Sequence, residues 1–233
     1  MAQRVDPPEV APAMAQDVLV QQALAQDRTK ALQLTPVPAA VLERLDRFVP
    51  LLLTWQRRIN LVAPSTLPHL WTRHVADSLQ LLALAPEARR WVDLGSGAGF
   101  PGIVLGCLLA DRPGATIDLV ESNGKKAAFL RSAAQIVDAP IAIHHGRIED
   151  FVATIAQTVD IVTARALAPL DRLLAMCHPL IHRGAQAVFP KGQDVEAELT
   201  EASKCWSITA TLVPSRTDPH GRIVVIRQAE RRP

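Results

Sequence analysis

The sequence predicts an α/β fold in which a doubly wound, mostly parallel sheet of seven strands follows a helical N-terminal segment. From residue 91 onward, short apolar runs rich in β-branched residues alternate with helical stretches, as βαβ units require. A glycine-rich turn separates the first run from the first helical stretch, and no helical stretch separates the last two runs. These three observations together predict parallel strands that end in an antiparallel pair.

Composition and charge exclude several classes of protein. Of 233 residues, 48% are hydrophobic and 21% are charged, which is typical of a globular protein and not of a disordered chain. No apolar run has the length of a membrane helix and no signal-peptide core follows Arg4, so we expect a cytoplasmic protein. The widely spaced Cys107, Cys177 and Cys205 predict neither disulfides nor a metal site. The net charge of +2 leaves nucleic acid open as a partner without selecting it.

Two segments precede the sheet. Residues 1–35 predict a poorly defined extension with a short helix over 17–32, and residues 36–90 predict a helical cap. Pro50 lies within the cap and predicts a kink or a break. Residues 91–233 are then the main domain, which we expect to form one structural unit with the cap. The cap's apolar residues recur at steps of three and four, which is one face of a helix: Val41, Leu45, Phe48, Leu52, Trp55 and Ile59.

The main domain alternates strands with helices. Strands are expected over residues 91–94, 116–121, 141–144, 159–164, 185–190, 207–213 and 223–227. Helices are expected near residues 102–110, 124–137, 148–157, 169–182 and 194–205. The loop between the last two strands is too short for a crossover helix, so these strands are expected to form an antiparallel hairpin. The expected sheet has six parallel strands closed by one antiparallel strand.

The strongest motif is the turn Asp93-Leu-Gly-Ser-Gly-Ala-Gly-Phe-Pro-Gly102, which follows the first strand and precedes the first crossover helix. It can be interpreted in two ways. Gly95, Gly97 and Gly99 alternate behind the acidic Asp93, but Gly97-x-Gly99-x-x-Gly102 also matches a dinucleotide fingerprint. An anion at Asp93 suits a ligand with an ammonium group or a cationic sulfur and opposes a pyrophosphate. The turn therefore favours a cationic ligand, with an NAD-dependent oxidoreductase as a rival.

Two acidic positions follow the next strands. Glu121 ends the second strand about 20 residues beyond the glycine turn, where a carboxylate can chelate two ribose hydroxyls. Residues 146–150 (Gly-Arg-Ile-Glu-Asp) follow the third strand. An acid there can accept the amino group of an adenine, but it can equally stabilise the start of a helix.

The motifs together resemble those of the RsmG (GidB) family of ribosomal RNA methyltransferases. Besides the glycine turn, the resemblance spans about residues 40–228 and rests on Asn60-Leu61-Val62, Arg73-His74-Val75-Ala76-Asp77-Ser78, Lys125-Lys126, Phe129-Leu130, Thr163-Ala164-Arg165-Ala166 and Pro190-Lys191-Gly192. It implies a Rossmann-like, seven-stranded class I methyltransferase fold in a bacterial cytoplasmic enzyme. The implied reaction transfers a methyl group from S-adenosylmethionine to N7 of one guanine in 16S ribosomal RNA.

The resemblance also implies which residues contact the cofactor: Gly95, Phe100, Ile148, Glu149 and Arg165. To these the glycine turn and the second strand add Asp93, Gly97, Gly99 and Glu121. The chain departs from the family pattern in having Glu121 where Asp is frequent and Ala98 where Pro is frequent. The first departure keeps the carboxylate, so we expect it to be harmless.

The implied chemistry needs no general base, because guanine N7 carries a free lone pair. In-line SN2 attack then depends on positioning. Lys191 and Arg165 end two neighbouring strands at the ligand-binding edge. We expect Lys191 at guanine O6 or a flanking phosphate, unless it is a solvated loop lysine. We expect Arg165 at the cofactor carboxylate or an RNA phosphate, unless it forms a structural ion pair. His74 has a structural or a catalytic role, and Arg73 and Asp77 are spaced to pair on a helix.

The expected partner is 16S ribosomal RNA or the small ribosomal subunit. A phosphate-contacting surface would come from Arg57, Arg58, Arg89, Arg90, Lys125, Lys126 and Arg131, and Trp71 is the best candidate for stacking on a base. We expect a monomer without a metal, since there are no coiled-coil heptads or metal-ligand motifs. Methylation of a small molecule and non-catalytic RNA binding are the alternatives.

Overall fold

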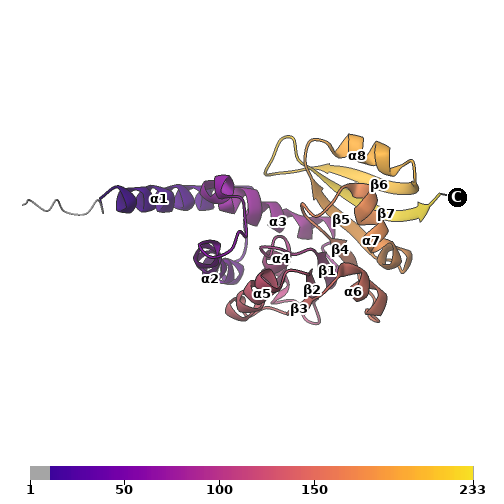
Figure 1. Cartoon of the computed structure of the whole chain (residues 1–233), viewed down its shortest axis with the longest axis horizontal. Coiled ribbons are helices and arrows are strands. Elements are labelled where there is room, and N and C mark those ends of the chain that lie inside the picture. The colour runs from indigo at the N-terminus through magenta and orange to yellow at the C-terminus, as the bar shows by residue number, and fades with distance from the viewer. Residues whose placement is uncertain (1–10, 233) are drawn as a thin grey trace, which may run out of the picture.

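The computed structural model describes residues 11–232, with side chains from Val20 onward. The first ten residues of the predicted extension therefore lie outside the described part. Within it, seven strands form one sheet (Figure 1): β1 (Arg90–Leu94), β2 (Thr116–Glu121), β3 (Ile141–His145), β4 (Ile161–Thr163), β5 (Gln186–Lys191), β6 (Trp206–Pro214) and β7 (Arg222–Arg231). The strand order is β3-β2-β1-β4-β5-β7-β6, which confirms the predicted seven-stranded α/β sheet.

Strand directions also agree with the prediction. β1 to β5 pair in parallel, whereas β7 is antiparallel to both β5 and β6. Six strands therefore point one way and β7 runs against them. β7 lies between β5 and β6, so the antiparallel strand is not at the edge of the sheet. The loop between β6 and β7 spans residues 215–221, which permits a hairpin and no crossover.

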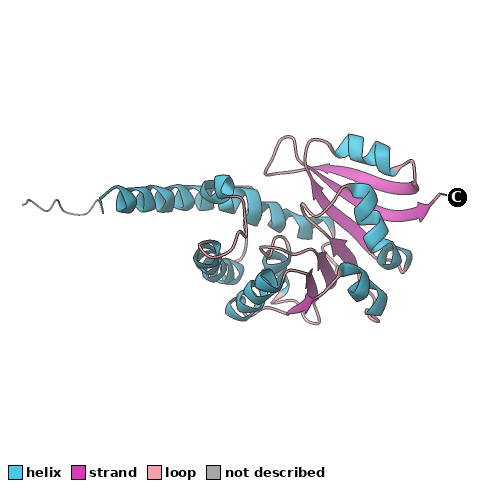
Figure 2. Ribbon diagram, in the orientation of Figure 1, coloured by secondary structure: helices cyan, strands magenta, loops and turns pink. Residues whose placement is uncertain are grey.

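Helices cover both faces of the sheet (Figure 2). One face packs against α2 (Ala39–Gln56), α4 (Gly102–Leu109) and α5 (Gly124–Val137), and the other against α6 (Ile148–Thr154), α7 (Leu170–His182) and α8 (Val195–Ala202). Neighbouring residues of one strand supply opposite layers, since Trp91 belongs to the first core and Val92 to the second. Burial on both faces explains why the sequences of the strands are continuous apolar runs.

The N-terminal helix α1 (Ala11–Leu34) is longer than predicted and projects from the body of the protein in Figure 1. Its C-terminal half packs against the short helical segments η1 (Pro64–His69) and η2 (Trp71–Ala76). The buried Asp27 accepts hydrogen bonds from the backbone N–H (3.0 Å) and the hydroxyl of Thr72. The guanidinium of Arg28 lies 5.4 Å from the ring centre of Trp71, which is only 3% exposed. The expectation that Trp71 stacks on a base is therefore wrong, because α1 covers it.

Helix α2 continues through Pro50, so of the two predicted outcomes, a kink or a break, only the break is wrong. Proline removes one backbone hydrogen bond, but the helix buries an apolar face against the core that outweighs this loss. The hydroxyl of Thr54 donates to the carbonyl oxygen of Pro50 at 2.9 Å. Beyond η2 the cap ends with α3 (Asp77–Leu79) and η3 (Gln80–Leu84). Among the helices of residues 11–232, none combines the length and apolar character needed to cross a membrane.

Candidate active site

The glycine turn between β1 and α4 has a left-handed backbone at three positions. The φ angles of Gly95, Gly97 and Gly99 are +69°, +54° and +82°, which favours glycine at each. A Cβ atom at Gly95 would lie 2.6 Å from Leu167 Cδ1, and one at Gly99 would lie 2.5 Å from Ile103 Cγ1. A Cβ atom at Gly97 would meet only a backbone oxygen at 3.7 Å. Space beside the backbone is therefore open at Gly97, where a ligand can approach closely.

The carboxylate of Glu121 holds this turn from the end of β2. Its Oε2 accepts the N–H of Gly97 at 2.8 Å, and its Oε1 accepts the N–H of Asn123 at 2.7 Å. The residue is 7% exposed, so the carboxylate is fixed in orientation. Each oxygen keeps a second lone pair. The predicted contact with ribose hydroxyls would use these lone pairs.

Asp93 differs from the sequence interpretation, which placed an anion at a cationic ligand. Its side chain is fully buried beneath the start of α4, where Oδ2 accepts the N–H of Gly102 at 3.1 Å. Oδ1 has no hydrogen-bond partner among the described residues. Burial raises the pKa of Asp93 to about 7, against the opposing effects of its hydrogen bonds and of Arg165. A Cβ atom at Gly102 would lie 2.6 Å from Oδ2, so close packing on Asp93 explains the last glycine of the motif.

Phe100, His74 and Arg165 form a stack next to the turn. The rings of Phe100 and His74 are 5.0 Å apart at 24°, and the Arg165 guanidinium lies 5.4 Å from the Phe100 ring centre. Arg165 Nη2 donates to His74 Nδ1 at 2.8 Å, so His74 Nε2 carries the proton and donates to the hydroxyl of Thr66 at 2.9 Å. Phe100 is buried, so a cofactor contact at this position would have to use its backbone.

The environment of His74 keeps its imidazole neutral. Burial lowers the pKa of His74 to about 3, and the positive charges of Arg165 and Arg73 act in the same direction. Because both ring nitrogens are hydrogen-bonded, the geometry favours the structural role over the catalytic one.

Asp77 faces Arg165 and not Arg73. Its Oδ2 is 3.8 Å from Arg165 Nη1, and its Oδ1 accepts hydrogen bonds from Thr217 (2.8 Å) and Gln80 (2.9 Å). The predicted Arg73–Asp77 pair is absent from the described part of the chain. Residues Trp71–Ala76 form a π-helix, whose wider turn removes the α-helical register on which that pair depended.

A cavity of about 680 Å³ opens where β4 and β5 end and β7 begins. Basic and acidic side chains share its wall: Arg73, Arg165, Lys191 and Arg222 with Asp77, Glu198 and Asp218. The glycine turn does not line this cavity, and residues 165–167 connect the two features because Leu167 packs over Gly95. The loop 215–221 forms the far wall and is held by Gln80, whose Oε1 accepts the N–H of Arg216 at 2.9 Å.

Lys191 lines this cavity but is not a solvated loop lysine. Its side chain is 9% exposed, and Nζ donates to the carbonyl oxygen of Ala168 (2.9 Å) and to Oε2 of Glu198 (2.7 Å). Oε2 of Glu198 also accepts the N–H of Leu170 at 2.8 Å. The lysine therefore joins α8 to the loop after β4. Glu198 could not be predicted from the sequence, because its position on α8 gives no sign of the strand end that it faces.

Ile148 and Glu149 begin α6 on the other side of the turn. No side chain caps this helix, so its first-turn N–H groups have no side-chain acceptor. Ile148 packs against the core, whereas Glu149 is exposed and lies 3.4 Å from Arg147 Nε. The N–H of Gly146 donates to the carbonyl oxygen of Glu121 at 3.1 Å. This contact links the start of α6 to the end of β2.

Solved structures share this fold. Cofactor-bound Rv0187 from MTB matches with a TM-score of 0.55 and 16% identity, covering 97% of this chain and 100% of that one. The O-methyltransferase from Bacillus cereus in complex with SAH matches with a TM-score of 0.55 and 15% identity, covering 89% and 99%. At these identities the likeness bears on the fold alone, and it confirms the predicted class I methyltransferase fold.

Sequence relatives are much closer. The family model described as GidB, rRNA small subunit methyltransferase G, matches residues 41–221. Ribosomal RNA small subunit methyltransferase G of Bradyrhizobium sp. (strain BTAi1 / ATCC BAA-1182) is 58% identical over 214 residues, covering 92% of this chain and 96% of that one. The protein of the same name from Rhodopseudomonas palustris (strain BisB5) is 56% identical over 205 residues, covering 88% of each. The chain therefore belongs to the rRNA small subunit methyltransferase G (GidB) family.

Proposed function

We propose that this protein transfers the methyl group of S-adenosylmethionine to N7 of one guanine in 16S ribosomal RNA. The observation that carries the proposal is the open glycine turn at Gly97, held by Glu121 and joined through residues 165–167 to a polar cavity. A cofactor in the turn and an acceptor base in the cavity would meet at Arg165. Membership of the methyltransferase G family supports the same reaction.

The residues of the turn fit S-adenosylmethionine. Gly95, Gly97 and Gly99 form a cradle that is open beside Gly97, because glycine has no Cβ atom to fill that space. The free lone pairs of Glu121 suit ribose hydroxyls, and the first turn of α6, with Ile148 and Glu149, suits the edge of the adenine. When bound, the cofactor supplies an electrophilic methyl group on a cationic sulfur.

The chain's own residues have only to bind and orient the base, because guanine N7 needs no proton removed. The neutral, doubly hydrogen-bonded His74 fits a site without a general base. The remaining donors of Arg165 suit the cofactor carboxylate or an RNA phosphate, and Lys191 suits guanine O6 or a flanking phosphate. Both would act by positioning, which can supply much of the rate enhancement of such a transfer.

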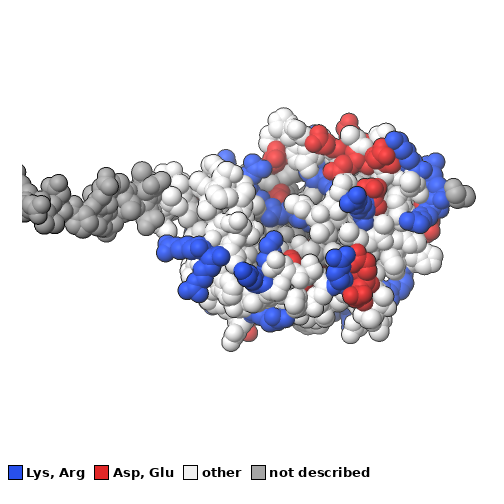
Figure 3. Space-filling model, viewed as in Figure 1, with Lys and Arg blue, Asp and Glu red and all other residues white. Residues whose placement is uncertain are grey.

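The RNA substrate is best placed away from α8. Acidic side chains gather over α8, whereas Lys and Arg lie over α2, α5 and the middle of the same face (Figure 3). Exposed basic residues at the end of α2 and on α5 are Arg57, Arg58, Lys125 and Arg131. Ribosomal RNA is the partner. We propose that the enzyme is a cytoplasmic monomer and that the form it methylates is 16S RNA or the small subunit. Phosphate contacts on this side would give salt-dependent affinity.

We further propose that the cap (36–90) and the main domain (91–233) act as one unit, with residues 1–35 as an extension. The shared core supports this division, because Phe48 and Leu52 of the cap pack in one cluster with Phe129 of the main domain. This unit places His74 and Asp77 of the cap at the wall of the cavity.

Transfer of a labelled methyl group from S-adenosylmethionine to small subunits that lack the modification tests the proposal. We expect label at N7 of a single 16S guanine, mapped on the isolated RNA, and none with a Gly97→Val variant. A protein that binds the cofactor but labels neither subunits nor free RNA would contradict the proposed substrate and favour a small-molecule acceptor.

A further inference from the structure

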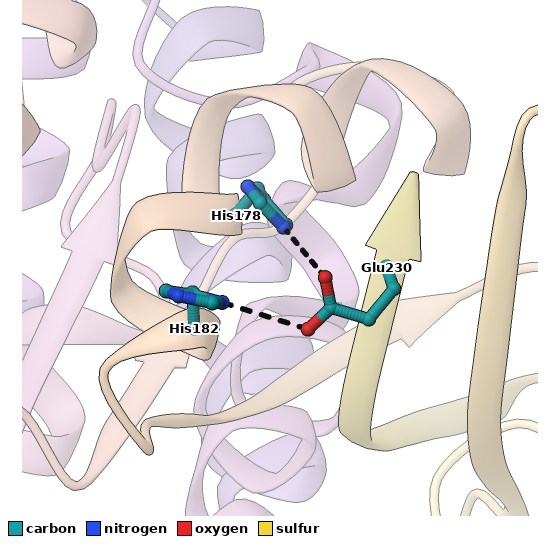
Figure 4. Close-up of side chains that lie close together, drawn as sticks. All are labelled: His178, His182 and Glu230. Atoms are coloured by element: carbon teal, nitrogen blue, oxygen red, sulfur yellow. Dashed lines mark ion pairs between the residues drawn. The ribbon is translucent and has the colours of Figure 1, made fainter. Parts of the chain in front are cut away.

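Two histidines and a glutamate converge far from the cavity, between α7 and β7 (Figure 4). His178 and His182 are four residues apart on α7, so they share one face of the helix. Nε2 of His178 lies 3.7 Å from Oε2 of Glu230, and Nδ1 of His182 lies 3.5 Å from Oε1 of the same carboxylate. Figure 4 shows both imidazoles directed at the carboxylate.

Hydrogen bonding does not explain this arrangement. N···O separations of 3.5 Å and 3.7 Å exceed those of ordinary hydrogen bonds. Nε2 of His178 is buried and has no hydrogen-bond partner among the described residues, although buried polar atoms normally have one. The imidazole of His178 is held by Trp206, whose ring centre is 5.3 Å away. A buried, unpartnered nitrogen directed at a carboxylate therefore needs another explanation.

Each histidine nitrogen lies close to a ligand–ligand spacing from a different oxygen of Glu230, as a carboxylate that binds one ion through both oxygens allows. Zinc bonds of about 2.1 Å at a tetrahedral angle place two ligand atoms about 3.4 Å apart. One ligand atom from each of the three residues can be chosen so that all lie within 4.8 Å of one another. We propose that His178, His182 and Glu230 bind a divalent transition-metal ion of the Zn²⁺ type.

The ligand chemistry selects the class of ion. Imidazole suits Zn²⁺, Co²⁺ and Ni²⁺, whereas Mg²⁺ and Ca²⁺ prefer sites built of oxygen ligands alone. Two histidines and one glutamate leave a fourth position for water. The residues between the histidines are Pro-Leu-Ile, so the helix offers no acid there to act as a general base. We therefore assign the site to binding of the ion.

The position of the site separates it from methyl transfer. Arg222 at the start of β7 lines the cavity, and Glu230 lies eight residues further along the strand. At about 3.3 Å per residue these two positions are about 25 Å apart. The ion would instead join the C-terminal turn of α7 to the end of β7. Solvent access is open, because the side chains of His182 and Glu230 are 68% and 62% exposed.

The sequence predicts no metal at this place, because neither cysteine spacing nor a short metal-ligand motif marks it. Glu230 lies on the last strand, far from the histidines in sequence, and only its pairing opposite Ser207 of β6 fixes its position beside α7. The histidine pair alone gives too weak a signal to predict an ion.

Metal titration of the full chain tests the proposal. Because Cys205 is exposed and a thiol also binds Zn²⁺, the parent protein carries Cys205→Ser and is freed of metal with a chelator. We expect calorimetry to give one Zn²⁺ per chain and Co²⁺ to give a tetrahedral visible spectrum. The variants His182→Ala and Glu230→Gln, both at exposed positions, should bind at least about tenfold more weakly. A His69→Ala control, also at an exposed histidine, should bind as the parent does.

Thermal unfolding provides a second measurement. Zn²⁺ should raise the midpoint of the parent and of His69→Ala but not that of His182→Ala or Glu230→Gln, because an ion that binds only the folded state stabilises it. Equal affinity in all four proteins, or no saturable binding by the parent, would overturn the proposal. Methyl transfer is expected to be the same with and without Zn²⁺. Absence of transfer in both forms would therefore bear on the proposed function alone.

Discussion

The two halves of the ligand-binding edge of the sheet are built differently. At β1, β2 and β3 the site consists mainly of backbone, with glycines of left-handed φ and the uncapped N–H groups of α6, and one fixed carboxylate, Glu121. At β4, β5 and β7 it consists of charged side chains, of which Arg165 and Lys191 are held by residues of other elements. The first half is suited to a ligand of fixed shape, and the second to a charged substrate. A backbone site should therefore fail when the backbone changes, and a side-chain site when charges change.

The largest effect is expected from Gly97→Val. A branched side chain would fill the open space at Gly97, so affinity for S-adenosylmethionine should fall at least about 100-fold, measured by calorimetry. Gly114→Val is the matched control, because Gly114 also has a left-handed φ (+72°) and open space but lies in the turn before β2. Both variants should lose about 1–2 kcal/mol of stability from backbone strain. Equal loss of cofactor affinity in the two would show that strain, and not the site, is responsible.

The same contrast explains what the sequence could predict. The glycine turn and Glu121 are local, so the order of strand, turn and helix was enough to place them. The ion pair of Lys191 with Glu198, the stack of His74 on Phe100 and the covering of Trp71 by α1 depend on tertiary contacts. The burial of Asp93 escaped prediction for another reason, because a carboxylate at a strand end is ordinarily exposed. Side-chain sites need the fold before their partners are known.

Asp93 is expected to give the second largest effect, because a carboxyl group is buried in the backbone half. Burial raises its pKa from the ordinary value of 3.8 to about 7, so the folded state binds a proton that the unfolded state has already lost in between. This contribution to stability is fully present below pH 3.8 and is lost as the pH rises to about 7. Between pH 5 and pH 8 the parent should therefore lose about 2 kcal/mol relative to Asp93→Asn, which cannot ionise. Urea unfolding of both proteins at the two pH values measures the difference.

His74 does not disturb that comparison. Its lowered pKa of about 3 acts in the opposite direction, since stability is lost as pH falls below the ordinary value of 6.5, but it does so in both proteins. Parallel pH profiles for the parent and Asp93→Asn would contradict the neutral carboxyl group beneath the turn.

Lys191 tests the side-chain half. Lys191→Ala should leave affinity for S-adenosylmethionine within about twofold and lower kcat/KM for RNA about tenfold, measured by labelled methyl transfer. Glu198→Gln separates two roles of the lysine, because glutamine keeps an oxygen for the Leu170 N–H but removes the charge that pairs with Lys191. If Lys191 serves the RNA, Glu198→Gln should retain kcat/KM within about twofold. If both variants lose activity equally, the lysine only holds the loop after β4.

The smallest effect concerns Glu149, a side chain at the margin of the backbone half. Glu149→Gln should weaken binding of S-adenosylmethionine about threefold, because an exposed hydrogen bond to an adenine amino group contributes little beyond what water supplies. Asp150→Asn is its matched control, since both acids lie in the first turn of α6 and each stabilises that helix end by about 0.5 kcal/mol. Calorimetry on the two variants separates recognition from helix stabilisation. If affinity changes equally in both, the first turn of α6 acts through its backbone, and the contrast between the two halves becomes sharper.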